Sequence, residues 1–222
     1  MYSNKDVSRI RPEDLMSLLK WWGNNSRDFP WRHTRDPFLI LITEMLLRKT
    51  TAKQVEKVYD KIIMMYGTPK KLAEANETEL VETIRPLGME HKRALLLIRL
   101  SSDILNKHGG KVPSNKKDLL ELPGVGQYAA NAVLCFGYGN SVSTIDTNFI
   151  RVFQRFTGIK SSVSRPRNDT VFLELINSVM RNEQSRDINY GILDLAALIC
   201  KPKNPKCIKC PLKSECSFFN NK

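Results

Sequence analysis

Residues 122–133, Leu-Pro-Gly-Val-Gly-Gln-Tyr-Ala-Ala-Asn-Ala-Val, place Gly124 and Gly126 between two short helical patterns. Glycine adopts turn conformations that are closed to other residues, and it leaves no side chain in the way of an approaching phosphate. The amides that begin the following helix face outward at the positive end of its dipole. The segment therefore predicts two helices joined by a tight turn that binds phosphate, although an ordinary turn has the same local sequence.

The rest of the chain is also predicted to be nearly all helix, because apolar residues recur at helical spacing and strand-like alternation is scarce. Asp36 and Pro37 form a cap followed by proline at the first helical position, which predicts a long helix from Phe38 onward. Ser114 is the expected cap of the helix over 115–121, which leads into the glycine turn. A short helix is expected to begin at Thr68-Pro69. The other expected helices span about 12–24, 77–86, 90–107, 115–121, 127–137, 147–157, 169–181 and 187–200. We expect an all-α fold.

The chain carries 35 Lys and Arg against 23 Asp and Glu, a formal net charge of +12. A basic protein of this kind favours a polyanionic partner, most simply nucleic acid, although a lysine-rich protein without such a partner has the same charge. No apolar run reaches the roughly 18 residues of a membrane span, and the amino terminus does not resemble a signal peptide. The sequence therefore predicts a cytoplasmic protein with reduced cysteines.

Four cysteines, Cys200, Cys207, Cys210 and Cys216, lie within 17 residues near the carboxyl end, spaced C-x6-C-x2-C-x5-C. In a reduced compartment such a group indicates metal ligands rather than disulfides. Zinc sites usually use two C-x2-C pairs, and this segment has one. The irregular spacing favours a [4Fe–4S] cluster, with zinc as the alternative. The fifth cysteine, Cys135, lies in an apolar helix and is expected to be a buried small hydrophobe.

The glycine turn, Asp146 twenty residues later and the cysteine spacing together resemble the helix-hairpin-helix DNA glycosylases of the endonuclease III superfamily. The resemblance covers essentially the whole chain and implies two helical domains with a cleft between them. Residues 29–143 would form a six-helix barrel that ends in the hairpin, and residues 1–28 with 144–222 would form a second domain with a cluster loop at 200–216. Enzymes of this family flip a nucleotide out of the duplex into the cleft.

Tyr128 narrows the resemblance to the thymine-DNA mismatch glycosylases. The bifunctional endonuclease III type has a lysine at this position, whose amine forms a Schiff base, and the adenine type usually has serine. A phenol cannot form an imine, so this route to strand cleavage is closed at position 128. Residues 27–37 and 42–52 also resemble the thymine-DNA subfamily.

The resemblance implies three catalytic residues. Asp146 would be the carboxylate that faces the sugar, and its alternative role is to cap the helix that follows it. Glu44 lies in an apolar run, where burial would raise its pKa and suit it to proton donation, while a surface ion pair with Arg48 is the alternative. Tyr128 would line the base pocket, or else pack behind the hairpin.

Further residues are expected to contact DNA. Asn148 would position Asp146 or the sugar, or simply begin its helix, and Met89 would fill the gap left by the flipped base, with an ordinary loop methionine as the alternative. The hairpin carbonyls of Leu120, Leu122 and Val125 match ligands of a monovalent cation that bridges to a phosphate when DNA is bound. The expected contacts beside the mismatch and at the hairpin are Arg48, Lys49, Leu122, Gly124, Val125, Gly126 and Gln127.

These inferences predict a monomeric, monofunctional glycosylase that removes thymine and uracil mispaired with guanine in double-stranded DNA. The alternative enzyme is an adenine glycosylase that acts on mispairs with guanine or oxidised guanine. A different class of protein also uses such a hairpin: a non-catalytic DNA-binding module that clamps a phosphate. Asp146 and Glu44 would have no purpose in that third case.

Overall fold

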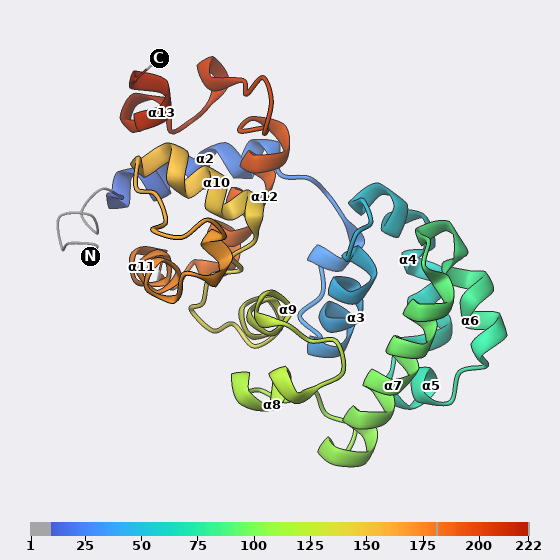
Figure 1. Cartoon of the computed structure of the whole chain (residues 1–222). Coiled ribbons are helices and arrows are strands. Elements are labelled where there is room, and N and C mark those ends of the chain that lie inside the picture. Colours follow the sequence, from blue (N-terminus) through green and yellow to red (C-terminus); the bar gives the residue numbers. More distant parts are fainter. Residues whose placement is uncertain (1–9, 181, 222) are drawn as a thin grey trace. The chain divides into compact units, whose positions relative to one another are not determined.

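The computed structural model describes residues 10–180 and 182–221, which form two compact units (Figure 1). One unit spans Asp28–Asn140, and the other combines the described residues up to Arg27 with those from Ser141 onward. Every regular element in the described residues is helical, which confirms the predicted all-α fold. Within these residues no helix is both long and apolar enough to cross a lipid bilayer.

The unit 28–140 is built around its longest helix, α7, which packs alongside α5 and α6 (Figure 1). The apolar helix α3 packs against α4, α7 and α9, and seven of its eleven residues are buried. Its elements are η1 (Pro30–Arg32), α3 (Pro37–Leu47), α4 (Ala52–Tyr66), α5 (Pro69–Ala73), α6 (Glu77–Ile84), η2 (Arg85–Leu87), α7 (Glu90–His108), α8 (Lys116–Glu121), α9 (Gln127–Ala132) and η3 (Val133–Gly137).

Short polar side chains begin most of these helices. The carboxylate of Asp36 accepts hydrogen bonds from the first amides of α3, as the sequence predicts, and Pro37 follows at the first helical position. Thr51, Thr68 and Asn76 cap α4, α5 and α6 in the same way. Each cap provides an acceptor for an amide that has no partner inside its helix.

The cap predicted for α8 was wrong, and two predicted helices differ in detail from the sequence pattern. The long helix from Phe38 ends at Leu47, because Lys49 takes a left-handed conformation (φ 55°) and α4 starts afresh at Ala52. The cap of α8 is Asn115 rather than Ser114. The helix predicted over 127–137 spans these residues, as an α-helix to Ala132 and a π-helix over Val133–Gly137.

The second unit packs α2 and α10 against α12 around a core of aromatic and aliphatic side chains, in which Phe149 and Phe172 are almost fully buried. Residues 1–9 and residue 181, the last of the helix predicted over 169–181, lie outside the described residues. The elements of this unit are α2 (Pro12–Asn25), α10 (Thr147–Thr157), η4 (Pro166–Asn168), α11 (Thr170–Met180), α12 (Ser185–Leu198), η5 (Cys207–Lys209), η6 (Lys213–Glu215) and α13 (Ser217–Asn220).

A buried carboxylate joins the end of α2 to α12. Asp194 is fully buried and accepts hydrogen bonds from Nε of Arg27 at 2.5 Å and from the indole of Trp22 at 3.0 Å. It also accepts from the backbone amide of Arg27 at 3.0 Å. A charge this deeply buried is stable only when it is paired, so these contacts fix the chain at the point where it leaves this unit.

Candidate active site

The glycine turn has the geometry that its sequence predicts. The amide of Val125 donates to the carbonyl of Leu122 at 3.1 Å, and Gly124 has a φ of +75°. The positive φ favours glycine there, and a Cβ atom would lie 2.8 Å from a methyl group of Leu96, which would have to move. A Cβ on Gly126 would meet nothing within 4 Å, which leaves the approach to the first amides of α9 open.

Arg48 supports this turn from the end of α3. Its guanidinium donates to the carbonyl of Gly124 at 3.1 Å and lies 3.9 Å from the sulfur of Met45. The structure therefore gives Arg48 a role in holding the hairpin, which the sequence did not indicate. A contact of Arg48 or of the exposed Lys49 with DNA stays a prediction.

Arg93 holds the segment that carries Arg48. It lies on α7 and is only 4% exposed. Its guanidinium donates to the carbonyls of Met45 (2.6 Å), Leu46 (3.1 Å) and Arg48 (3.1 Å) and to the hydroxyl of Thr50 (2.9 Å). Burial, together with the positive charge of Arg48, lowers the pKa of Arg93. The guanidinium thus binds the carbonyls that α3 leaves without partners at its end.

Glu44 and Tyr128 lie on α3 and α9, two helices that pack against each other in the unit 28–140. Both side chains are half-buried, so Glu44 is less enclosed than its apolar neighbours suggest. Asp146 belongs to the other unit. That all three residues act on one nucleotide stays a prediction.

Asp146 caps α10. Its carboxylate accepts a hydrogen bond from the amide of Phe149 at 2.6 Å, and its second oxygen accepts one from the side-chain amide of Asn148 at 2.7 Å. Asp146 itself is half-buried, whereas Phe149 is 1% exposed and anchors the start of α10 in the core. The capping role is therefore present, and it holds the carboxylate in a fixed orientation that a catalytic role also needs.

A chain of hydrogen bonds continues from Asp146 to the cysteine segment. Arg151 donates from Nη1 to the side-chain carbonyl of Asn148 at 2.8 Å. Its other nitrogens donate to the backbone carbonyls of Cys200 at 2.9 Å and Ala196 at 3.1 Å. Arg151 thus connects the residue that holds Asp146 to the end of α12. The sequence gives only a weak indication of this role, because an arginine one turn into an amphipathic helix is common.

The segment that leads to Asp146 is also fixed. Thr144 is fully buried, and its amide and hydroxyl donate to the side-chain carbonyl of Asn189 at 2.7 and 3.0 Å. Asn189 in turn donates to the carbonyls of Val142 and Ser185. The sequence did not predict this contact. The one feature of the sequence that could indicate it is an asparagine on an apolar helix.

Met89 has the exposure expected of a residue that reaches toward DNA. It is 49% exposed and precedes α7 in a left-handed conformation (φ 53°), next to Gly88 at φ 72°. A non-glycine residue at such a φ is uncommon and is held there by its surroundings. The turn therefore presents the Met89 side chain at the surface of its unit.

The four cysteines at the carboxyl end line one pocket, together with Arg155, Lys213 and apolar side chains. Burial, together with the charges of the other three cysteines, raises the pKa of the Cys210 thiol to about 11. Burial also raises the pKa of Cys216. Four thiolates here would repel one another unless a cationic centre bound them, and such binding releases their protons. Among the described residues, however, no three potential ligand side chains form a group that could hold a single metal ion.

Arg155 holds the loop that carries these cysteines. It donates to the carbonyls of Lys201 at 2.7 Å and Pro202 at 3.0 Å, and it lies 3.5 Å from the sulfur of Cys200. Its guanidinium carbon stacks 4.6 Å from the ring centroid of Phe218. A positive charge therefore lies beside the pocket that the four cysteines line.

Comparisons with known proteins match both the sequence and the fold. Residues 42–177 match the family described as HhH-GPD superfamily base excision DNA repair protein. The chain is 40% identical over 213 residues to a thymine/uracil-DNA glycosylase of Methanothermobacter thermautotrophicus, with 96% of each chain covered. It is 42% identical over 207 residues to a thymine-DNA glycosylase of Aeropyrum pernix, with 92% of this chain and 93% of the other covered. A solved thermostable thymine-DNA glycosylase matches 99% of both chains with a TM-score of 0.90 and 38% identity.

Proposed function

The chain belongs to the HhH-GPD superfamily of base excision DNA repair proteins, and on this premise we propose that it is a monofunctional DNA glycosylase that removes thymine and uracil mispaired with guanine. The observation that carries the proposal is the placement of Asp146, whose carboxylate is held at the start of α10 by Phe149 and Asn148. The full-length similarity to glycosylases named for thymine and uracil supports the choice of base.

The proposed reaction replaces the bond between C1′ of the sugar and the base by a bond to water. As the base leaves, the sugar becomes cationic, and the carboxylate of Asp146 stabilises that charge. The departing base becomes anionic, and we assign its stabilisation to the protonated carboxyl of Glu44, or water that it holds, and to the hydroxyl of Tyr128, which donate hydrogen bonds to it. The proton that the attacking water loses then neutralises the released base. Uracil lacks only the methyl group of thymine and fits the same pocket.

The absence of an amine at position 128 leads to a testable difference from bifunctional relatives. We expect the wild-type protein to release the base and leave the DNA backbone intact until alkali or heat cleaves it, because a phenol forms no imine. The substitution Tyr128→Lys should create an adduct with DNA that borohydride traps, visible as a shifted band on a denaturing gel. Trapping of the wild-type protein would show that another amine acts and that the enzyme is bifunctional.

Arg151 is proposed as a positioning residue for Asp146, since it holds Asn148 and the start of the cysteine loop together. The substitution Arg151→Met should lower the single-turnover rate of thymine release by about tenfold, because catalysis is sensitive to small shifts of a reacting group. Arg151→Lys should restore part of the rate. A loss of duplex binding with an unchanged rate at saturating enzyme would instead give Arg151 a DNA-binding role.

We further propose that Cys200, Cys207, Cys210 and Cys216 hold a [4Fe–4S] cluster. Such a cluster gives the carboxyl-terminal segment a fixed centre that its few apolar residues do not supply, and the six lysines among residues 201–222 offset its negative charge. Protein purified without oxygen should be brown, absorb light at about 400 nm, and contain about four iron atoms per chain. A colourless protein that contains one zinc ion would contradict this assignment.

The substrate is tested by measuring base release from duplexes that differ in one base pair. We expect release of the base from T·G and U·G pairs and none from T·A. We also propose that the enzyme is cytoplasmic and acts as a monomer. When DNA is bound, the hairpin carbonyls would hold a monovalent cation. Release of adenine from A·G pairs without release of thymine would identify an adenine glycosylase. Binding without release from any pair would leave a non-catalytic DNA-binding module.

A further inference from the structure

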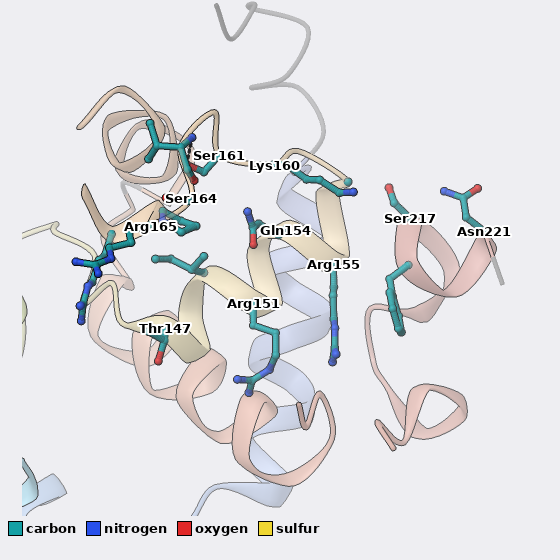
Figure 2. Close-up of a pocket in the computed structure, with 16 residues that line it drawn as sticks. Thr147, Arg151, Gln154, Arg155, Lys160, Ser161, Ser164, Arg165, Ser217 and Asn221 are labelled. Carbon is teal, nitrogen blue, oxygen red and sulfur yellow. Dashed lines mark hydrogen bonds between the residues drawn. The ribbon is translucent and has the colours of Figure 1, made fainter. Parts of the chain in front are cut away.

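A cationic groove runs along α10 in the second unit, with a volume of about 1210 Å³ (Figure 2). Its floor is α10, and its sides are the segment 158–167 and α13. Five basic residues line it: Arg151, Arg155, Lys160, Arg165 and Arg167. No aspartate or glutamate lines the groove in the part of the chain that the structure describes. Its electrostatic field therefore favours a polyanion.

The basic residues of the groove fall into two groups. Arg151 and Arg155 are half-buried and donate to backbone carbonyls of the cysteine loop, so they contribute charge but few free donors. Arg165 and Arg167 lie on the side wall and are exposed. Neither of these two guanidinium groups makes a hydrogen bond or ion pair with another residue in the described part of the chain. They remain available to bind an incoming anion bidentately.

The length and lining of the groove indicate what kind of anion it takes. Because α10 has eleven residues, the groove floor is about 16 Å long, enough for several consecutive phosphates of one strand. Hydroxyl and amide side chains, among them Thr147, Gln154, Ser164 and Ser217, line it between the cations. Such short polar groups bind phosphate and sugar oxygens in protein–nucleic acid complexes.

The groove begins beside the residue to which we assign the chemistry. Thr147 lines it and directly follows Asp146, the cap of α10. If the sugar of a DNA strand lies at Asp146, the end of the groove at Thr147 is therefore only one protein residue away. An acidic peptide would match the charge as well, but it lacks this continuity with the proposed reaction site.

We propose that this groove binds the phosphodiester backbone of a nucleic acid strand, as a second phosphate-binding site in addition to the glycine hairpin. The inference rests on the proposed function, because it takes the strand to be part of the DNA substrate. Arg165 and Arg167 are the residues that contact phosphate directly.

The test compares Arg165→Gln/Arg167→Gln with the control Lys70→Gln/Lys71→Gln, which removes the same charge from exposed positions of α5 in the other unit. Binding of a fluorescein-labelled undamaged duplex, and of one of its strands alone, is measured from low to high salt. Removing one bound phosphate should reduce the slope of log K against log salt by about 0.9 for the duplex or about 0.7 for the single strand. The groove variant removes two phosphate contacts, so we expect its slope to fall by about 1.8 with the duplex or about 1.4 with the single strand. The slope of the control should change less. The two probes distinguish a duplex from a single strand as the occupant.

Equal slopes for the groove variant and the control would overturn the inference. So would loss of binding to a fluorescein-labelled oligo-glutamate peptide with both nucleic acid slopes unchanged, since the groove would then take an acidic protein segment. The single substitutions Arg165→Gln and Arg167→Gln should each give half the effect, which keeps the test valid if the double variant folds poorly. If the proposed function fails, wild-type protein releases no base, whereas a failure of this inference leaves base release intact and the slopes equal.

Discussion

Replacing Asp146 by asparagine is expected to slow thymine release from a T·G duplex by about 1,000-fold or more under single-turnover conditions. The substitution removes the negative charge that stabilises the cationic sugar, and charge stabilisation is commonly the largest single contribution to such catalysis. Asparagine caps helices as well as aspartate does, so it keeps the acceptor for the amide of Phe149 at the start of α10. The fold and the affinity for DNA should therefore be preserved.

Asp36→Asn is the matched control for this experiment. Asp36 caps α3 in the same way, with its carboxylate accepting from the amides of Phe38 and Leu39. Its substitution makes the same chemical change at a cap to which no catalytic role is assigned, so the rate should stay within a few-fold of the wild type. A similar loss in both variants would mean that capping, not the charge at position 146, determines the rate.

Replacing Arg93 by methionine is expected to lower the free energy of unfolding by about 3 kcal/mol, because hydrogen bonds to a charged group are strong and their buried acceptors are left unpaired. The substitution keeps an unbranched stem that matches the arginine as far as Nε but removes the donors to Met45, Leu46 and Arg48. The midpoint of thermal unfolding should fall by roughly 6–12 °C for a chain of this size.

The matched control is Arg99→Met, on the same helix α7 but exposed to solvent. A surface substitution of this kind should change stability by no more than about 0.5 kcal/mol. Calorimetry of both variants gives the comparison. If Arg93→Met is as stable as the control, Arg93 does not hold the end of α3, and the account of how Arg48 reaches the hairpin is wrong.

The sequence predicts the parts of this structure that depend on local chemistry. The Gly124 turn, the Asp36 cap and the start of α10 at Thr147 each follow from a few neighbouring residues. The break between α3 and α4 could not be read in this way. It depends on Lys49 in a left-handed conformation, which is held by Arg93 from a helix more than 40 residues away.

The contacts that orient the candidate catalytic residues were not predictable for the same reason. Arg151 and Asn189 look ordinary in the sequence, since an arginine on an amphipathic helix and an asparagine among apolar residues have many uses. Their roles arise from partners 40 or more residues away, at Cys200 and Thr144. The sequence thus proposes candidate catalytic residues, whereas the tertiary structure determines what holds them in place.

The most direct test of this account is a crystal structure of the Asp146→Asn variant bound to a duplex with one T·G pair. We expect the thymidine to be extruded, the side chain at position 146 to face its C1′ atom, and the amides after Gly124 to contact a phosphate of the same strand. A complex in which position 146 lies away from the sugar, or in which the thymine stays stacked while the variant remains inactive, would contradict it.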